Sequence, residues 1–320
     1  MEHCPSTKTE ERVNAVILSV VRNRELDDLL ATMESFERTF NSRYRYPYAI
    51  FNDQPFTQEF IDRVRNATQA TVEFALIPKE HWSLPSFIDP KRAHREMARQ
   101  EFEGYLYGGL ESYHHMCRWN SGFFYKHPLM EKYEYYWRIE PSTDYYCYID
   151  FDPFLLMKKN NKVYGFTIIA NEYLQTVRGL WKSTMDYIKL KKGKAVPRHL
   201  MAFHDTKKND YNGIHFWTNF EIADLKWFRS KEYNDYFDYL DRTGGFFFER
   251  WGDAPVHTLA AGLLLNENQM HYFYDIGYRH SDRLHCPQDI PSKGYIVQNK
   301  CTSSPDLADR KGPWHTYGLV

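Results

Sequence analysis

Four side chains with carboxylate or imidazole groups occur where predicted secondary-structure elements begin or end. Glu140 ends a predicted strand directly before Pro141, and Glu221 starts a predicted helix directly after a strand. Asp253 lies in a Gly-Asp-Ala-Pro turn before a helix, and His280 follows the last predicted strand. Because the edge of a sheet exposes such positions, these residues are candidates for metal ligands and catalytic carboxylates.

Each of these residues also has an ordinary structural interpretation. Glu140 would then be a solvated loop carboxylate, and Glu221 a first-turn carboxylate favoured by the helix dipole. Asp253 would be a helix N-cap and His280 a surface histidine. The motifs HEXXH, GxSxG and CxxC are absent from the sequence, which excludes the commonest metalloprotease, hydrolase and redox sites.

Three predicted strands separated by two predicted helices begin the chain. Residues 13–21 form a continuous apolar, β-branched run of the kind found in buried parallel strands, and residues 48–51 and 71–77 are shorter strands. Apolar residues at helical spacing predict helices over residues 22–40 and 56–64. This alternation predicts a doubly wound, nucleotide-binding start to an α/β fold.

The carboxyl ends of these strands are the expected ligand crevice. The polar residues at these ends are Arg22, Asn23, Asn52 and Asp53. Neither GxGxxG nor GxxxxGK[ST] occurs in the sequence. We therefore expect a phosphate group to be held by a metal ion or by basic side chains.

The remaining sequence continues as helices and strands with no repeat, low-complexity block or linker. Further strands are predicted over residues 133–140, 143–150, 162–170 and 270–276, and further helices over residues 91–103, 110–124, 154–161, 174–192 and 232–245. Residues 214–230 are predicted to pass from a strand into a helix, with Thr218 or Asn219 near the N-cap. One α/β domain accounts for this pattern.

The composition limits the class of protein. The chain has 320 residues, 42% of them hydrophobic, which is enough for a sizeable core. Its 41 basic and 42 acidic residues give a formal net charge of -1, so no basic excess indicates a nucleic-acid partner. No apolar run of 18 or more residues predicts a membrane span. Aromatic residues reach 17%, which suits stacking on sugars and bases as well as a core.

Several long stretches resemble the fungal α-1,2-mannosyltransferases of glycosyltransferase family 15. The most distinctive are YGGLESYHHMCRWNSGFF, YYWRIEP, HFWTNFEIADL, GGFFFERWGDAPVHT and HYFYDIGYRH. The resemblance runs in order over roughly residues 12–286. It implies a GT-A-type nucleotide-sugar transferase fold, a single domain with a mixed central sheet and a Rossmann-like N-terminal half. We expect residues 1–12 to be a flexible leader, 13–286 the catalytic domain and 287–320 an irregular tail.

The resemblance also implies an activity. Members of this family are type II membrane proteins of the Golgi that transfer mannose from GDP-mannose, with Mn²⁺ and with retention at the anomeric carbon. The expected acceptor is a mannose-terminated glycan or glycoprotein. Because no anchor is found, we expect this chain to be a truncated, soluble form of such a protein.

Site residues follow from the same resemblance. Glu140 and His280 correspond to metal ligands, although relatives often have an acidic residue where this chain has Ser142. Asp144, Asp150 and Asp152 are rival ligands nearby. Glu221 corresponds to the carboxylate proposed as nucleophile, and Tyr113 to a tyrosine near the transferred sugar.

Five further residues are predicted to contact the nucleotide sugar. They are Arg22, Asn52, Asp53, Arg118 and Asp253. Arg118 and Arg22 would place positive charge near the diphosphate, with a structural salt bridge as the alternative for each. Asp253 would accept hydrogen bonds from sugar hydroxyls. His257, four residues later, is interpreted as a hydrogen-bonded, partly buried histidine rather than a ligand.

Several alternatives stay open at this point. The chain is either the transferase described, a catalytically silent sugar-binding homologue, or a mannosylphosphate transferase. Retention proceeds either by double displacement or by front-face attack. A disulfide between Cys286 and Cys301 and glycosylation of Asn66 are both compatible with a secretory compartment.

Overall fold

The structure is a computed structural model, and it describes residues 12–191 and 199–287. Most of the expected leader and tail, and Cys301 of the expected disulfide, lie outside these residues. No helix among the described residues is long and apolar enough to cross a membrane.

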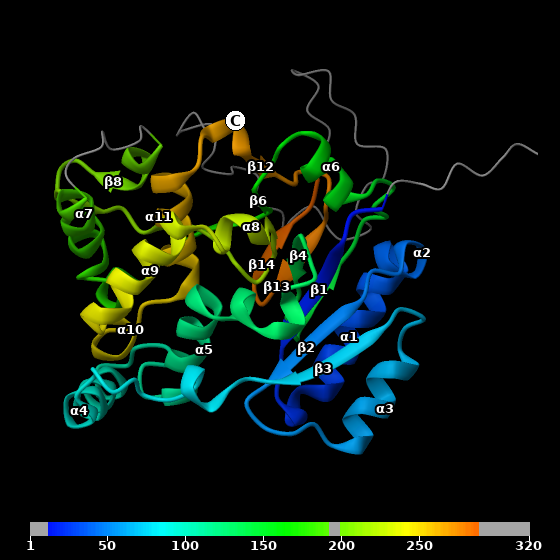
Figure 1. The fold of residues 1–320 in the computed structure, drawn as a ribbon, viewed down its shortest axis with the longest axis horizontal. Helices are drawn as coiled ribbons and strands as arrows, with labels where there is room; N and C mark the ends of the chain where they lie inside the picture. Colours follow the sequence, from blue (N-terminus) through cyan, green and yellow to red (C-terminus); the bar gives the residue numbers. More distant parts are fainter. Residues whose placement is uncertain (1–11, 192–198, 288–320) are drawn as a thin grey trace, which may run out of the picture.

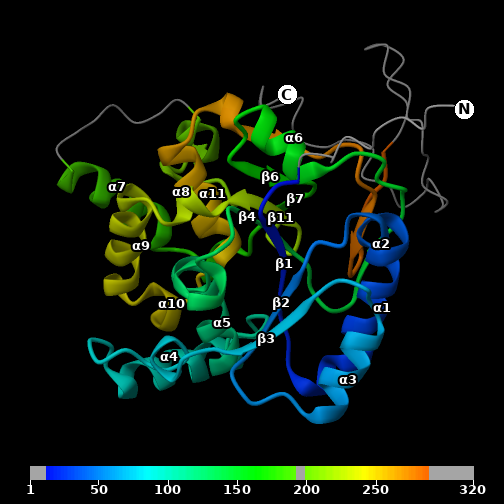
Figure 2. The same ribbon diagram turned by 45° about the vertical axis from the view of Figure 1, so that its right-hand side comes forward.

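Seven strands of the described residues form a central sheet that lies between two layers of helices (Figures 1 and 2). Its strand order is β12-β6-β11-β4-β1-β2-β3. The bounds are β1 Ala15–Val20, β2 Tyr48–Asn52, β3 Val72–Leu76, β4 Tyr135–Arg138, β6 Tyr164–Phe166, β11 Glu221–Asp224 and β12 Met270–Tyr272. Strands β1 to β4 are parallel, whereas β11 is antiparallel to both β4 and β6. The expected mixed α/β sheet with a Rossmann-like N-terminal half is confirmed.

One layer of helices comes from the N-terminal part of the chain and the other from its centre and C-terminal part (Figure 2). The first layer contains α1 (Leu26–Phe36), α2 (Ser42–Tyr44) and α3 (Gln58–Asn66). The second contains α4 (Pro90–Phe102), α5 (Glu111–Gly122), α7 (Leu180–Leu190), α8 (Leu225–Phe228), α9 (Lys231–Thr243), α10 (Gly245–Phe248) and α11 (Asp253–Leu264). Helix α6 (Pro153–Lys159) follows the loop after β5.

The alternation of side chains along β1 explains the two layers. Ala15 and Ile17 pack in a core with Met33 of α1, whereas Val16 and Leu18 pack in a second core with Trp119 of α5. Successive side chains of a strand point to opposite faces, so a strand that is apolar throughout needs a cover on each face.

Three smaller sheets of the described residues complete the fold. Strand β5 (Thr143–Tyr145) pairs with β13 (Tyr278–His280), which pairs with β14 (Arg283–His285). Strand β7 (Ile169–Asn171) pairs with β10 (Ile214–Phe216), and β8 (His204–Asp205) with β9 (Asp210–Tyr211). The pairing of β5 with β13 places a C-terminal segment beside the loop that follows β4.

Several elements differ from the sequence predictions. The predicted strand 162–170 is two strands, β6 and β7, in different sheets, and the predicted helix 174–192 begins only at Leu180. The prediction that Glu221 starts a helix is wrong, because this residue starts strand β11. Phe220 and Ile222 pack in one core and Ala223 in the other, which is the alternation of a strand. The helix begins after Asp224, whose side chain accepts a hydrogen bond from the backbone N–H of Lys226 at 2.7 Å.

Candidate active site

The carboxyl ends of β1 and β2 bring three of the predicted nucleotide residues together. Val20 pairs with Phe51 in register, so Arg22, Asn52 and Asp53 follow at the same edge of the sheet. The Arg22 guanidinium donates to Glu25 at 2.6 Å and is partly exposed. Asn52 is buried, and its side-chain oxygen has no hydrogen-bond partner among the described residues. A buried acceptor of this kind is what a bound ligand would satisfy.

Glu140 lies at the same edge on the other side of β1. Strand β4 is parallel to β1, and Leu18 pairs with Arg138, so Glu140 follows level with the end of β1. The hydroxyl of Thr32, on α1, lies 3.1 Å from the backbone oxygen of Glu140 and 2.9 Å from that of Thr143. In the strand order, β2 lies on one side of β1 and β4 on the other. Open α/β sheets bind ligands at such a point, where the strand order changes direction.

His280 is brought to this edge by the small sheet. It pairs in register with Thr143, and its Nδ1 lies 3.4 Å from the backbone oxygen of Ser142. Ser142 has a φ of 62°, in the left-handed region, so the loop turns sharply after Glu140. The ring of His280 lies 5.1 Å from that of Trp217. Glu140 and His280, 140 residues apart in sequence, thus lie at one end of the sheet.

Two of the three rival acidic residues, Asp144 and Asp152, have other structural roles. Asp144 pairs with Arg279 at 2.5 Å. Asp152 caps α6 and accepts a hydrogen bond from Tyr46 at 2.6 Å. No group of three or more His, Cys, Asp or Glu side chains suited to a metal ion occurs in residues 12–191 and 199–287. A metal ion held by Glu140 and His280 would therefore need further ligands from a bound substrate.

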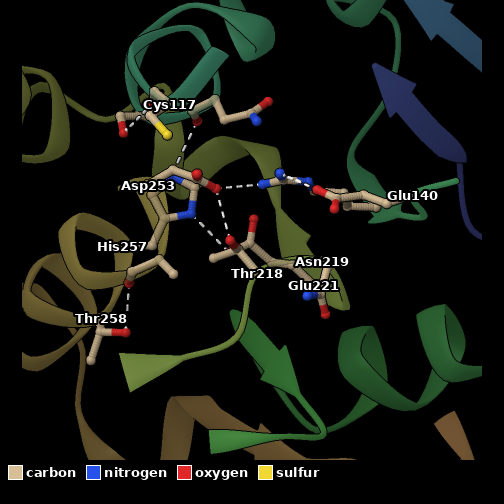
Figure 3. A network of polar contacts seen from close by, with 12 residues as sticks. Cys117, Glu140, Thr218, Asn219, Glu221, Asp253, His257 and Thr258 are labelled. Carbon is tan, nitrogen blue, oxygen red and sulfur yellow. Dashed lines mark hydrogen bonds and ion pairs between the residues drawn. The ribbon is translucent and has the colours of Figure 1, made fainter. Parts of the chain in front are cut away.

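Arg138 connects Glu140 with Asp253. Its guanidinium donates to the carboxylate of Glu140 and, at 2.5 Å, to that of Asp253, which also accepts from Thr218 at 2.8 Å (Figure 3). Burial alone would lower the pKa of Arg138, but the charges of Asp253 and Glu140 outweigh it and hold that pKa above its ordinary value. Asp253 is thus a buried ion-pair partner as well as a candidate acceptor for sugar hydroxyls.

Glu221 lies in a closed network of donors. Its side chain is 1% exposed, and its carboxylate accepts hydrogen bonds from the hydroxyl of Tyr136 and, at 2.5 Å, from that of Tyr164. Burial, together with the charge of Glu221, raises the pKa of both tyrosines well above its ordinary value. His257 on α11 approaches the same carboxylate at 2.8 Å.

Tyr113 lies near the N-terminus of α5, half-buried, where its ring stacks on that of Tyr107 with centroids 4.7 Å apart. Its hydroxyl accepts a hydrogen bond of 3.3 Å from Arg250, which pairs with Glu172. Burial raises the pKa of Tyr113 well above its ordinary value, and the charge of Asp253 adds to this effect. The phenol is therefore a hydrogen-bond donor at neutral pH.

Arg118 is paired with a carboxylate of a neighbouring helix. It is buried on α5 and makes two hydrogen bonds, of 2.7 and 2.8 Å, to the carboxylate of Asp241 on α9. This geometry is the structural salt bridge that the sequence left as the alternative. A contact of Arg118 with the diphosphate stays a prediction.

The sequence reasoning missed three members of the site and described a fourth correctly. The missed residues are Arg138, Tyr136 and Tyr164. The interpretation of His257 as a hydrogen-bonded histidine is confirmed, although it is fully buried rather than partly so. One signal was available in the sequence, since Arg138 is a charged residue between Trp137 and Ile139 in an apolar strand.

Comparison with known proteins gives consistent matches. A family model described as glycolipid 2-alpha-mannosyltransferase matches residues 1–310. O-glycoside alpha-1,2-mannosyltransferase omh1 of Schizosaccharomyces pombe is 45% identical over 306 residues, which cover 94% of this chain and 77% of that protein. Glycolipid 2-alpha-mannosyltransferase of Saccharomyces cerevisiae is 47% identical over 289 residues, which cover 90% of this chain and 64% of that protein.

Two solved structures share the fold. Core-mannan synthase A (CmsA/Ktr4) from Aspergillus fumigatus, in its Mn/GDP form, superposes with a TM-score of 0.87 at 39% identity, over 98% of this chain and 84% of that one. The mannosyltransferase Ktr4p from S. cerevisiae, in complex with GDP, gives a TM-score of 0.85 at 37% identity, over 96% of this chain and 79% of that one. The expected GT-A-type fold is confirmed by this likeness.

Proposed function

Because the chain belongs to the glycolipid 2-alpha-mannosyltransferase family, we propose that it transfers mannose from GDP-mannose to O2 of a mannoside, with Mn²⁺ and with retention. Residues 13–286 form the catalytic domain in this proposal. The observation that carries it is the convergence of Glu140 and His280 with Arg22, Asn52 and Asp53 at one edge of the sheet. Solved relatives with the same fold contain GDP, and one of them also contains Mn.

The residues at this edge fit Mn²⁺ bound together with a diphosphate. A carboxylate and an imidazole are suitable ligands for this ion, and diphosphate oxygens would complete the set. Among the described residues Arg138 binds Oε1 of Glu140, and Oε2 would be the oxygen that contacts a ligand. The bound ion would offset the negative charge that develops on the departing GDP. Ser142, where relatives are often acidic, leaves Glu140 as the carboxylate ligand in this loop.

The nucleotide would lie along the ends of β1 and β2. Asn52 offers a buried acceptor that has no partner in the part of the chain that the structure describes, and the half-buried Asp53 follows it. The guanidinium of Arg22 would add positive charge near the diphosphate, because it is partly exposed and held in place by Glu25.

The sugar would lie between the sheet edge and α11. Positive charge develops on the sugar ring as GDP departs, and the carboxylate of Glu221 would stabilise this charge. The hydroxyl of Tyr113 would orient the sugar or the acceptor by donating a hydrogen bond. The hydrogen-bond contacts to both oxygens of Glu221 lower the nucleophilicity of its carboxylate, so we propose that electrostatic stabilisation and front-face attack are favoured over covalent attack.

The proposal extends to the acceptor and to the location of the protein. The acceptor is a mannose-terminated glycan or glycoprotein, and the full-length protein would lie in the Golgi lumen as a type II membrane protein. Both statements rest on the family resemblance. Immunolocalisation of the full-length protein tests the second, and residence in another compartment would contradict it.

A transfer assay tests the activity. The purified chain is incubated with GDP-mannose and methyl α-mannoside, in Mn²⁺ or in EDTA, and the linkage of the product is read by NMR. An α-1,2-linked disaccharide formed only with the metal is expected. GDP binding without any product on several mannosides would indicate a silent homologue, and a phosphodiester-linked product would indicate mannosylphosphate transfer.

A further inference from the structure

His257 is a buried titratable group with two well-defined partners. It lies on α11, is 0% exposed, and is one helical turn after Asp253. Its Nδ1 is 2.8 Å from Oε2 of Glu221, and its Nε2 is 3.1 Å from the backbone oxygen of Asn120 on α5 (Figure 3). Both ring nitrogens are thus in hydrogen-bond contact with oxygen.

The chemistry of these partners fixes the number of protons. A backbone carbonyl only accepts hydrogen bonds, so Nε2 of His257 must carry a proton to bond Asn120. Nδ1 then either carries a second proton and donates to the Glu221 carboxylate, or is bare and accepts from a protonated Glu221. In both arrangements one proton lies between Nδ1 and Oε2, and the pair has no net charge.

Burial favours this neutral pair. An unpaired carboxylate that is 1% exposed would carry a large desolvation cost, which a shared proton and two further hydrogen bonds offset. The hydroxyls of Tyr136 and Tyr164 donate these two bonds. Because burial raises the pKa of both tyrosines, each phenol keeps its proton at neutral pH.

We infer that His257 is a positioning residue for Glu221, and that the two side chains share one proton across the Nδ1···Oε2 contact. The shared proton fixes the orientation of the carboxylate. When positive charge develops on the sugar, the proton shifts from Oε2 to Nδ1 and the negative charge on Glu221 increases, while no proton enters or leaves the pair. The proton shift during the reaction rests on the proposed function, whereas the shared proton itself does not.

NMR of the ring nitrogens tests the shared proton without any substrate. In protein labelled with ¹⁵N at histidine, we expect a protonated Nε2 and a strongly downfield, slowly exchanging proton at the Nδ1 contact. Glu221→Gln should shift this signal, and His257→Asn should remove it. A ring whose Nε2 carries no proton would overturn the inference, even if the protein proved to be an active mannosyltransferase.

Two isosteric variants test the positioning role. His257→Asn places an amide N–H near the position of Nδ1, facing Glu221, whereas His257→Gln places one near the position of Nε2, facing Asn120. We expect kcat to fall about tenfold in the first and about a hundredfold in the second, with KM for GDP-mannose changed by less than about twofold. In each double variant with Glu221→Gln, kcat should equal that of Glu221→Gln alone.

His114 provides the matched control. It is also a buried histidine of the same region, but its two ring nitrogens contact only backbone oxygens, those of Phe246 at 2.6 Å and Gly108 at 2.8 Å. His114→Asn should lower stability and leave kcat within about twofold of the parent value. A folded His257→Gln protein with parental kcat, or additive effects of His257→Gln and Glu221→Gln, would overturn the positioning role.

Discussion

Arg138 and Glu221 lie directly opposite each other on the antiparallel strands β4 and β11. Each is bound to α11, Arg138 to Asp253 and Glu221 to His257, and these two partners are one helical turn apart. Two side chains that face each other across β4 and β11 therefore bind two side chains on successive turns of α11. An ion pair and a histidine–carboxylate hydrogen bond meet in this buried square, so a change in one of the four side chains affects the orientation of the others.

Glu221→Gln tests the reacting-site carboxylate. The amide keeps the size of the side chain but removes its negative charge, so we expect a folded protein that binds GDP normally and has a kcat at least about a hundredfold lower. Single-turnover kinetics with GDP-mannose provide the measurement. Glu232→Gln, in the first turn of α9, is the control for loss of a carboxylate. A kcat near the parental value would exclude an essential role for the charge of Glu221.

Asp253→Asn tests the buried ion pair. Removing one partner leaves the Arg138 guanidinium with less compensation in a site where it is 5% exposed. We expect a loss of about 3–5 kcal/mol in the free energy of unfolding, measured with urea. Asp186→Asn removes one partner of an exposed pair with Lys182 and should leave the free energy of unfolding nearly unchanged, because solvent screens this pair. Equal losses in the two variants would contradict the role of the buried pair.

The same ion pair predicts a dependence of stability on pH. Burial would raise the pKa of Asp253, but the charge of Arg138 outweighs burial and lowers that pKa below its ordinary value of about 3.9. The stabilisation is therefore complete above about pH 5 and is lost as the pH falls through the unfolded pKa and then the lowered folded pKa. The gap in unfolding free energy between the parent and Asp253→Asn should be constant above about pH 5 and should narrow below about pH 4. A gap that widens on acidification would contradict the direction of this shift.

His280→Ala tests the second metal ligand. Loss of the imidazole should raise the Mn²⁺ concentration that supports GDP binding by at least about tenfold. It should leave the midpoint of thermal unfolding nearly unchanged, since this side chain is half-buried at the end of β13. His94→Ala, on the exposed side of α4, is the control. Unchanged Mn²⁺ titration curves in the presence of GDP would show that His280 is not a ligand.

The sequence predicted best where a signal is local. The apolar run at residues 13–21 and the helical spacing after it correspond to β1 and α1, because burial on both faces or along one stripe leaves a direct pattern. The loop after β4 was likewise anticipated from Pro141. Glu221 was misplaced because the stretch Glu221–Asp224 is short and its charged ends resemble the first turn of a helix.

The partners in the buried square depend on contacts between distant segments. Arg138 lies 115 residues from Asp253, and Glu221 lies 36 residues from His257. The register of β4 against β11 and the position of α11 decide these pairs, and neither is encoded in a local period. Resemblance to a family identified single residues, whereas only the fold shows which of them touch.

The central claim is that GDP binds at the sheet edge through a metal ion held by Glu140. Calorimetric titration of GDP, in Mn²⁺ and in EDTA, tests it on the parent, Glu140→Gln and Glu140→Ala, with Glu59→Ala on α3 as the control. Glu140→Gln keeps an acceptor for Arg138 but loses the charge that a metal ligand needs. In Mn²⁺ we expect both Glu140 variants to bind GDP at least about tenfold more weakly than the parent. Replacing Mn²⁺ with EDTA should not lower their affinity for GDP further. Parental affinity of both variants in Mn²⁺ would contradict the account.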